Sequence, residues 1–215
     1  MFSQNIYYPL SVGREWKYQT YGNQGQLGHV ETRTVISYEK KDDTYKIKHV
    51  FDYGKKDPAW SLELIKEKDE QIIFLAYAAN LSEDHSFMDY IHIDPNFNMS
   101  PKSLPQPKVL PEIYTPVNIV LLDTNMRINS KWIIEDTDLR TIINEVIDTL
   151  TVTVKAGTFN NVLKIKRTEN IKYASDINIY YEYYAPDTGL IKEEISSSHF
   201  GFRIFLRSEL ISYAK

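Results

Sequence analysis

The sequence predicts an all-β fold with at most a minor α-helical part, built as a curved antiparallel sheet that forms an open or half barrel. Aromatic residues make up 13% of the chain, including 16 tyrosines, and residues of this kind favour strands. Apolar and polar side chains alternate along many short segments, as they do in a strand with one buried face. Turns that contain glycine separate several of these segments, which is typical of hairpins.

Length and composition fit a single domain over residues 1–215. Hydrophobic residues make up 42% of the 215 residues, which is enough for a sizeable core. Cysteine is absent, which excludes disulfides, thiolate zinc sites and thiol catalysis. The 25 basic and 29 acidic residues form no long run of one sign, so no nucleic-acid partner is predicted. No motif implies a cofactor.

Membrane and export signals are not recognisable in the chain. No apolar run approaches the ~18 residues that span a bilayer, so no transmembrane segment is predicted. Residues 1–10 lack a basic region followed by an apolar stretch. If the natural protein is exported, we expect its signal or anchor segment to be absent from this chain.

The first third of the chain shows the clearest alternation. It predicts strands between Trp16 and Tyr53, with Lys40–Asp43 as a polar turn between two of them. A further pair of strands is expected over Trp60–Ile65 and Gln71–Ala78. The charged segment Lys66–Glu70 separates this pair, as in a hairpin.

The stretch at about 95–116 holds six of the nine prolines. Because proline has no N–H to donate to a ladder, this stretch cannot be a central strand. It is predicted to be a long ordered loop or an edge excursion. The alternative is a linker between two half-domains.

After Trp132 the sequence again predicts strands joined by tight turns. Turns at Lys155–Thr158 and Pro186–Gly189 each supply a glycine where a positive φ is expected. The strands are predicted over 150–154, 162–166, 178–184, 190–195 and 202–210.

The segment 139–150 is ambiguous. Its apolar residues fall at helical spacing, and Thr137 or Asp138 could cap a helix. The same residues are rich in Ile, Val and Thr, whose stiff side chains suit a strand better. We predict a strand with a bulge and keep the helix as the alternative.

A short sequence pattern occurs once in each half of the chain. Val12–Trp16 and Ile128–Trp132 share an apolar residue, then a residue tolerant of positive φ, then a tryptophan three places on. Each segment could turn the chain into a strand whose first inward residue is the tryptophan. This pattern suggests an internal duplication.

Four segments together resemble a large group of uncharacterised bacterial envelope proteins and lipoproteins. Residues 7–18 read YYPLSVGREWKY, resembling the opening pattern YxPLxxGxxWxY of that group. Residues 152–165 resemble its VxVPAGTFxxxLKI turn, with Lys155 where proline is usual, and residues 183–192 and 208–213 its last hairpin and closing strand. The resemblance implies a curved sheet similar to the lipoprotein carriers of the LolA and LolB type. It also implies a place in the cell envelope or periplasm, and no assigned activity.

The densest polar cluster lies between residues 83 and 94. His85, His92 and Asp94 are its candidate metal ligands, because a His-x-Asp pair with a second histidine nearby can hold a divalent metal. The alternative is a solvated loop. These residues would support a metal-dependent hydrolase, the only enzymatic alternative that we keep, and no catalytic residue is predicted.

Aromatic residues give the more specific hypothesis. If the sheet curls, its concave face could bind an apolar or lipid-like ligand, because tyrosine combines an apolar body with a polar tip. Burial of these residues on both faces of a central strand is the alternative. The expected function is therefore a non-enzymatic envelope protein that binds such a ligand, or else a structural or protein-interaction module. The candidate ligand-binding residues are Trp16, Tyr18, Trp132, Tyr181 and Tyr183.

Overall fold

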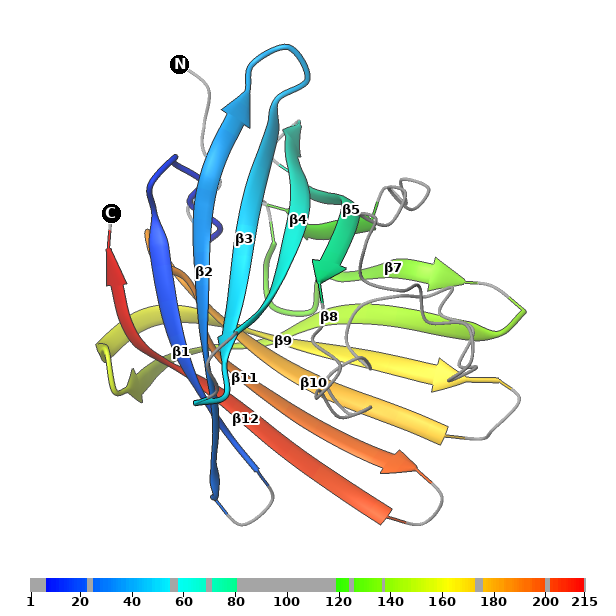
Figure 1. The fold of residues 1–215 in the computed structure, drawn as a ribbon. Coiled ribbons are helices and arrows are strands. Elements are labelled where there is room, and N and C mark those ends of the chain that lie inside the picture. The colour runs from blue at the N-terminus through cyan, green and yellow to red at the C-terminus, as the bar shows by residue number, and fades with distance from the viewer. Residues whose placement is uncertain are drawn as a thin grey trace.

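The computed structural model describes residues 7–22, 25–54, 58–68, 71–80, 119–123, 126–136, 138–172, 176–199 and 202–214. Over these ranges the chain forms twelve strands and no helix (Figure 1). The predicted all-β fold is confirmed. The strands are β1 Glu15–Tyr21, β2 Leu27–Glu39, β3 Thr44–Asp52, β4 Ala59–Lys68, β5 Gln71–Asn80, β6 Ile119–Asp123, β7 Lys131–Asp136, β8 Arg140–Val154, β9 Gly157–Ile171, β10 Asp176–Ala185, β11 Gly189–His199 and β12 Phe202–Ala214.

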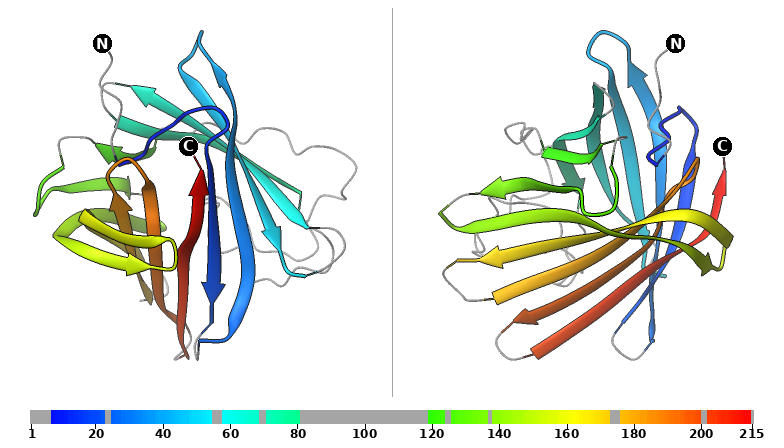
Figure 2. Two further views of the ribbon diagram at one scale, coloured as in Figure 1. Left: turned by 90° about the vertical axis from the view of Figure 1, so that its left-hand side faces the viewer. Right: turned by 180° about the vertical axis from the view of Figure 1, so that it is seen from behind.

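The strands form one antiparallel sheet in the order β6-β5-β4-β3-β2-β1-β12-β11-β10-β9-β8-β7. It consists of two meanders, β1–β6 and β7–β12, which join where β1 pairs with β12. The sheet curls until it nearly closes into a barrel (Figures 1 and 2). One seam stays unsealed, between the edge strands β6 and β7.

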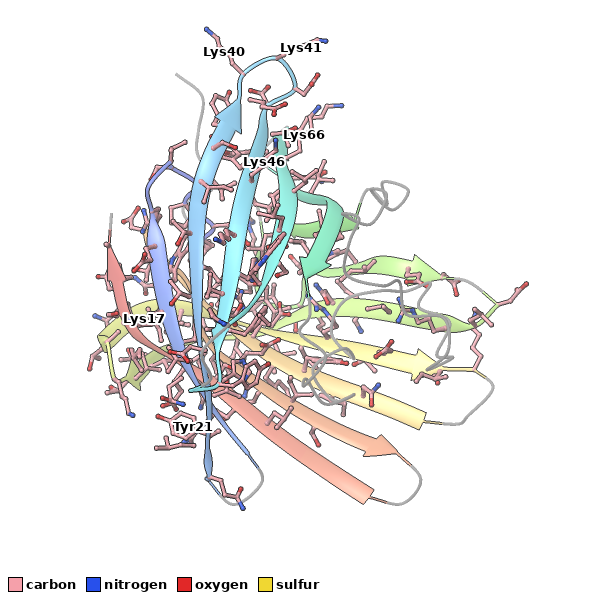
Figure 3. All side chains as sticks on the ribbon, in the orientation of Figure 1. Lys17, Tyr21, Lys40, Lys41, Lys46 and Lys66 are labelled. Carbon is pink, nitrogen blue, oxygen red and sulfur yellow. The ribbon has the colours of Figure 1, made fainter. Side chains whose placement is uncertain are left out.

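Alternation along the strands separates an inner face from an outer face. On β1, Trp16 and Tyr18 are buried on the inner face, at 5% and 2% exposed. Lys17 and Tyr21 project from the outer side of the same strand (Figure 3). Residues directly opposite in an antiparallel ladder share a face, so Arg33, opposite Trp16, also points inward.

From Arg140 on, the ambiguous segment 139–150 belongs to strand β8, which confirms the predicted strand. The register of β8 against β9 shifts between Val146 and Asp148 and again between Leu150 and Val152, so the expected bulge is present as well. The predicted turn glycines Gly157 and Gly189 have φ of 143° and 94°. Strand β4 runs to Lys68, so the turn expected over 66–70 begins later than predicted. The proline-rich stretch at 95–116 lies outside the described residues.

The long β8–β9 hairpin reaches past the ends of β10 and β11 toward β12 (Figure 2). Its turn is held there by a backbone hydrogen bond of 3.1 Å from Ala156 N to Leu210 O. The Lys155 ammonium lies 5.4 Å from the centre of the Tyr21 ring. Lys155, which stands where the resembling proteins have proline, therefore lies against the outer face of β1.

Candidate functional site

The inner face carries buried charged side chains, grouped on two walls. On the first wall, His49 lies between two carboxylates, with Nδ1 2.8 Å from Glu31 and Nε2 2.9 Å from Glu63. Arg33 donates two hydrogen bonds to Glu31, of 2.7 and 3.0 Å. Paired charges of this kind can stay ionised inside a protein because each is hydrogen-bonded as well as neutralised.

The network shifts the pKa values of its members. Burial alone would lower the pKa of His49, but the hydrogen bonds to Glu31 and Glu63 outweigh it and raise the pKa above 6.5. Burial would likewise raise the pKa of Glu31, but Arg33 and His49 outweigh it and hold this pKa far below 4.5. Glu31 is therefore ionised at neutral pH, and His49 holds its proton more tightly in the fold than in the unfolded chain.

These shifts predict a pH dependence of stability. The contribution of His49 is complete below pH 6.5 and is lost as the pH rises through its raised folded pKa. The contribution of Glu31 is complete above pH 4.5 and is lost as the pH falls toward its lowered folded pKa. We expect the free energy of unfolding of the wild type to fall above pH 6.5 more steeply than that of His49→Gln. Urea titrations from pH 5 to pH 9 measure both slopes, and equal slopes would contradict the assignment.

The second wall faces the first across the enclosed space. Arg167 Nη2 lies 2.7 Å from Glu182, and Glu182 is the direct cross-strand neighbour of Glu193. Burial raises the pKa of Glu182, and Glu193 raises it further. Arg167 lowers it, as does Arg33 of the first wall. The two walls are therefore in electrostatic contact.

A third cluster lies further along the inner face of β8 and β9. Arg140 forms ion pairs of 2.9 Å with Glu135 and 2.8 Å with Glu169. Asn178 and Tyr180 donate hydrogen bonds to Glu169, of 3.0 and 3.2 Å. This cluster joins four neighbouring strands, β7, β8, β9 and β10.

The inner face around Trp16 and Tyr18 is filled by the chain itself. Trp16 Nε1 donates to the Thr188 carbonyl, and the Tyr18 hydroxyl donates to the Leu190 carbonyl at 2.9 Å. The cavity that these two aromatic residues line with Tyr8 is only about 10 Å³. This volume has room for about one water molecule, so the Trp16 region has no space for a lipid chain.

Trp132 occupies a different position, on the edge strand β7 beside the seam. It lies opposite Asn144 in the ladder, and Asn144 accepts a hydrogen bond of 3.2 Å from Arg167. Trp132 thus shares the inner face with the second wall. It is partly buried against the core.

Tyr181 and Tyr183 lie on the outer face, since they alternate with the inward Tyr180 and Glu182. The Lys164 ammonium lies 4.6 Å from the Tyr181 ring centre and 5.3 Å from that of Tyr183. The Tyr183 hydroxyl donates to Glu194 at 2.7 Å. The five candidate aromatic residues therefore do not share one face of the sheet: Trp16 and Tyr18 lie together on the inner face and Trp132 lies by the seam. Tyr181 and Tyr183 lie on the other face of β10, where Tyr183 is itself buried in the hydrophobic core.

The candidate metal ligands His85, His92 and Asp94 lie outside the described residues. Within the described ranges, no group of three His, Asp or Glu side chains is arranged to hold a metal ion. The same ranges contain no helix that is long and apolar enough to cross a membrane.

Sequence reasoning missed the buried charges. Glu31, Arg33 and Val35 alternate along β2 and so share one face of the strand, and Val35 is fully buried. This spacing was the signal in the sequence that indicated inward-pointing charges. Charged residues are rarely buried unless they are paired, and their partner His49 lies on another strand.

Comparison with known proteins places this fold in a family. The model of the DUF3108-like family matches residues 11–199. The chain belongs to the DUF3108-like family. This membership confirms the resemblance to uncharacterised envelope proteins.

Two solved structures share the fold of this DUF3108-like chain. One is a protein assigned as a lipoprotein from Parabacteroides distasonis, with a TM-score of 0.60 and 15% identity over 99% of this chain and 100% of that one. The other is a protein assigned as exported, with a YmcC-like fold, from Bacteroides fragilis; the TM-score is 0.60 and the identity 16% over 98% of this chain and 100% of that one. No curated protein matches the sequence.

Proposed function

We propose that this DUF3108-like protein is a non-enzymatic, extracytoplasmic protein that binds an amphipathic, lipid-like ligand through the seam between β6 and β7. The observation that carries the proposal is the seam itself. The other junction of the two meanders, β1 with β12, is paired from Glu15 to Tyr21. The descriptions of the two similar structures, a lipoprotein and an exported protein, support an extracytoplasmic location.

Both edge strands carry a bulge. The register of β6 against β5 shifts between Val120 and Leu122, and that of β7 against β8 between Ile133 and Glu135. A bulge increases local twist and interrupts regular pairing, and bulges are over-represented at sheet edges. Bulges on both edges are therefore consistent with a seam that no ladder closes.

The core near the two edge strands is apolar. Ile72 and Leu122 are buried on the β5–β6 side, and Val146 is buried on β8. Leu121 and Trp132 are partly buried against the same core. An apolar chain that enters at the seam would extend this core, while the charged walls further in offer polar contacts to a head group.

We expect wild-type protein to bind dodecan-1-ol, detected by native mass spectrometry and by titration of tryptophan fluorescence. A lysine at the seam should weaken this binding, so Leu121→Lys is expected to raise the dissociation constant at least about tenfold, in keeping with the transfer energy of a few methylene groups. Ile36→Lys is the matched control. Ile36 is 44% exposed on β2, away from the seam, and its replacement should leave binding unchanged.

Absence of dodecan-1-ol binding by the folded wild type would contradict the proposal and leave a structural or protein-interaction role. Equal weakening by Leu121→Lys and Ile36→Lys would place the alcohol elsewhere. Circular dichroism and thermal unfolding of each variant show whether the fold is kept.

A further inference from the structure

The two meanders are internal repeats of each other, as their entry turns show. Gly13 N donates to Val35 O at 2.8 Å, and Asn129 N donates to Val146 O at 2.8 Å. Gly13 and Asn129 both have positive φ, of 88° and 72°. In each meander a tryptophan follows three residues later. The repeated sequence pattern therefore reflects a repeated backbone structure.

Two irregularities of the meanders also correspond. The register shifts directly after Val35 on β2 and directly after Val146 on β8. It shifts again directly before Ile65 on β4 and directly before Tyr184 on β10. Bulges are structural features at defined positions, so these two coincidences align β2 with β8 and β4 with β10.

This alignment pairs two rows of inward side chains. In the first repeat, three directly opposite residues form a row across β1, β2 and β3: Trp16, Arg33 and His49. In the second repeat, the equivalent row across β7, β8 and β9 is Trp132, Asn144 and Arg167. In the first row, Trp16 Nε1 donates to the Thr188 carbonyl. The second row lies on β7, β8 and β9, the three strands next to the open seam.

Asn144 carries a buried donor that no described residue satisfies. Arg167 Nε donates to Asn144 Oδ1 at 3.2 Å, and because a guanidinium has no acceptor, this contact fixes the orientation of the amide. Among the described residues the amide Nδ2 has no hydrogen-bond partner, and Asn144 is 0% exposed. A buried donor without an acceptor is strongly unfavourable, and on a strand next to the seam a ligand oxygen that enters there would satisfy it.

The charges around Asn144 select the kind of acceptor. Arg167 is already neutralised by Glu182, at 2.7 Å, and Glu193 lies directly opposite Glu182 on the next strand. An anionic head group would meet this carboxylate pair. A neutral carbonyl oxygen accepts a hydrogen bond without that repulsion, as the Thr188 carbonyl does in the first repeat.

We propose that Asn144 is the head-group donor of the seam, and that the second row binds the neutral carbonyl of an acyl ester or amide. This inference rests on the proposed function and specifies its ligand class. Asn144 Nδ2 donates to the carbonyl, Trp132 packs beside the head group, and the acyl chain lies along the apolar residues of the seam.

Three twelve-carbon probes test the proposal: 1-dodecanoylglycerol, which has a neutral ester, dodecan-1-ol, which has no carbonyl, and dodecanoate, which is anionic. We expect the wild type to bind 1-dodecanoylglycerol about tenfold more tightly than dodecan-1-ol, as one buried hydrogen bond predicts, and dodecanoate more weakly than the ester. Asn144→Leu keeps the branched outline of the side chain and removes the orphan donor, together with the acceptor of Arg167 Nε. It should lose the preference for the ester, and circular dichroism shows whether it keeps the fold. Ser61→Ala is the control. Ser61 Oγ, on the opposite wall, is another buried atom without a partner among the described residues, and its loss should leave the preference intact.

Equal affinity of the wild type for the ester and the alcohol would overturn the inference while leaving the proposed function standing. The same holds if Asn144→Leu keeps the ester preference. Failure of all three probes to bind would instead contradict the proposed function. Tighter binding of dodecanoate than of the ester would overturn the charge argument and assign an anionic head group.

Discussion

Arg33→Met is expected to lower the free energy of unfolding by about 3–5 kcal/mol, since breaking a buried ion pair leaves its partner charge uncompensated. Arg33 holds Glu31 through two hydrogen bonds, and its guanidinium lies 4.7 Å from the centre of the Tyr18 ring. Without Arg33, the buried Glu31 keeps His49 as its hydrogen-bond partner among the described residues. Urea unfolding at pH 7, followed by circular dichroism, measures the loss.

An exposed ion pair provides the control for this prediction. Lys46 lies 3.1 Å from Glu39, with both side chains at least 40% exposed, so Lys46→Met is expected to change the free energy of unfolding by at most about 1 kcal/mol. The double variant Arg33→Met/Glu31→Leu removes both charges and should regain part of the loss. A loss for Arg33→Met no larger than that for Lys46→Met would show that the inner network contributes little to stability.

Local patterns in the sequence were enough to predict most of the strands and turns, but not β6 or the end of β4. The stiff side chains of 139–150 outweighed their helical spacing, and the segment is indeed part of β8. The glycine turns followed from the need for positive φ at Gly157 and Gly189. Each of these features depends on residues close together in the chain.

The inner charged walls and the separation of the aromatic residues depend on contacts between distant strands. Alternation shows that Tyr180 and Tyr181 face opposite sides, but not which side is enclosed. That choice is set by the pairing of β1 with β12, whose residues lie almost 200 positions apart. The seam could not be predicted for the same reason, since bulges on β6 and β7 have an effect only where the curled sheet brings its two edges together.

Trp16→Ala is expected to lower the free energy of unfolding by about 3–5 kcal/mol, the range for truncating a buried large aromatic residue. Trp16 is 5% exposed and its indole is hydrogen-bonded to the Thr188 carbonyl. Trp132→Ala should lower it by only about 1–2 kcal/mol, because Trp132 is partly buried on an edge strand. Thermal and urea unfolding of the two variants measure the difference.

This difference matters because the two tryptophans occupy equivalent positions in the repeats. A residue that mainly stabilises the fold and a residue that mainly binds a ligand should respond in opposite ways to 1-dodecanoylglycerol. Added ligand should raise the unfolding midpoint of Trp16→Ala as much as that of the wild type, since binding to the native state alone stabilises it. Trp132→Ala should show a smaller rise. If instead Trp132→Ala destabilises the protein as much as Trp16→Ala does and keeps the full ligand-induced rise, Trp132 is a core residue of the second repeat and the seam does not bind the head group beside it.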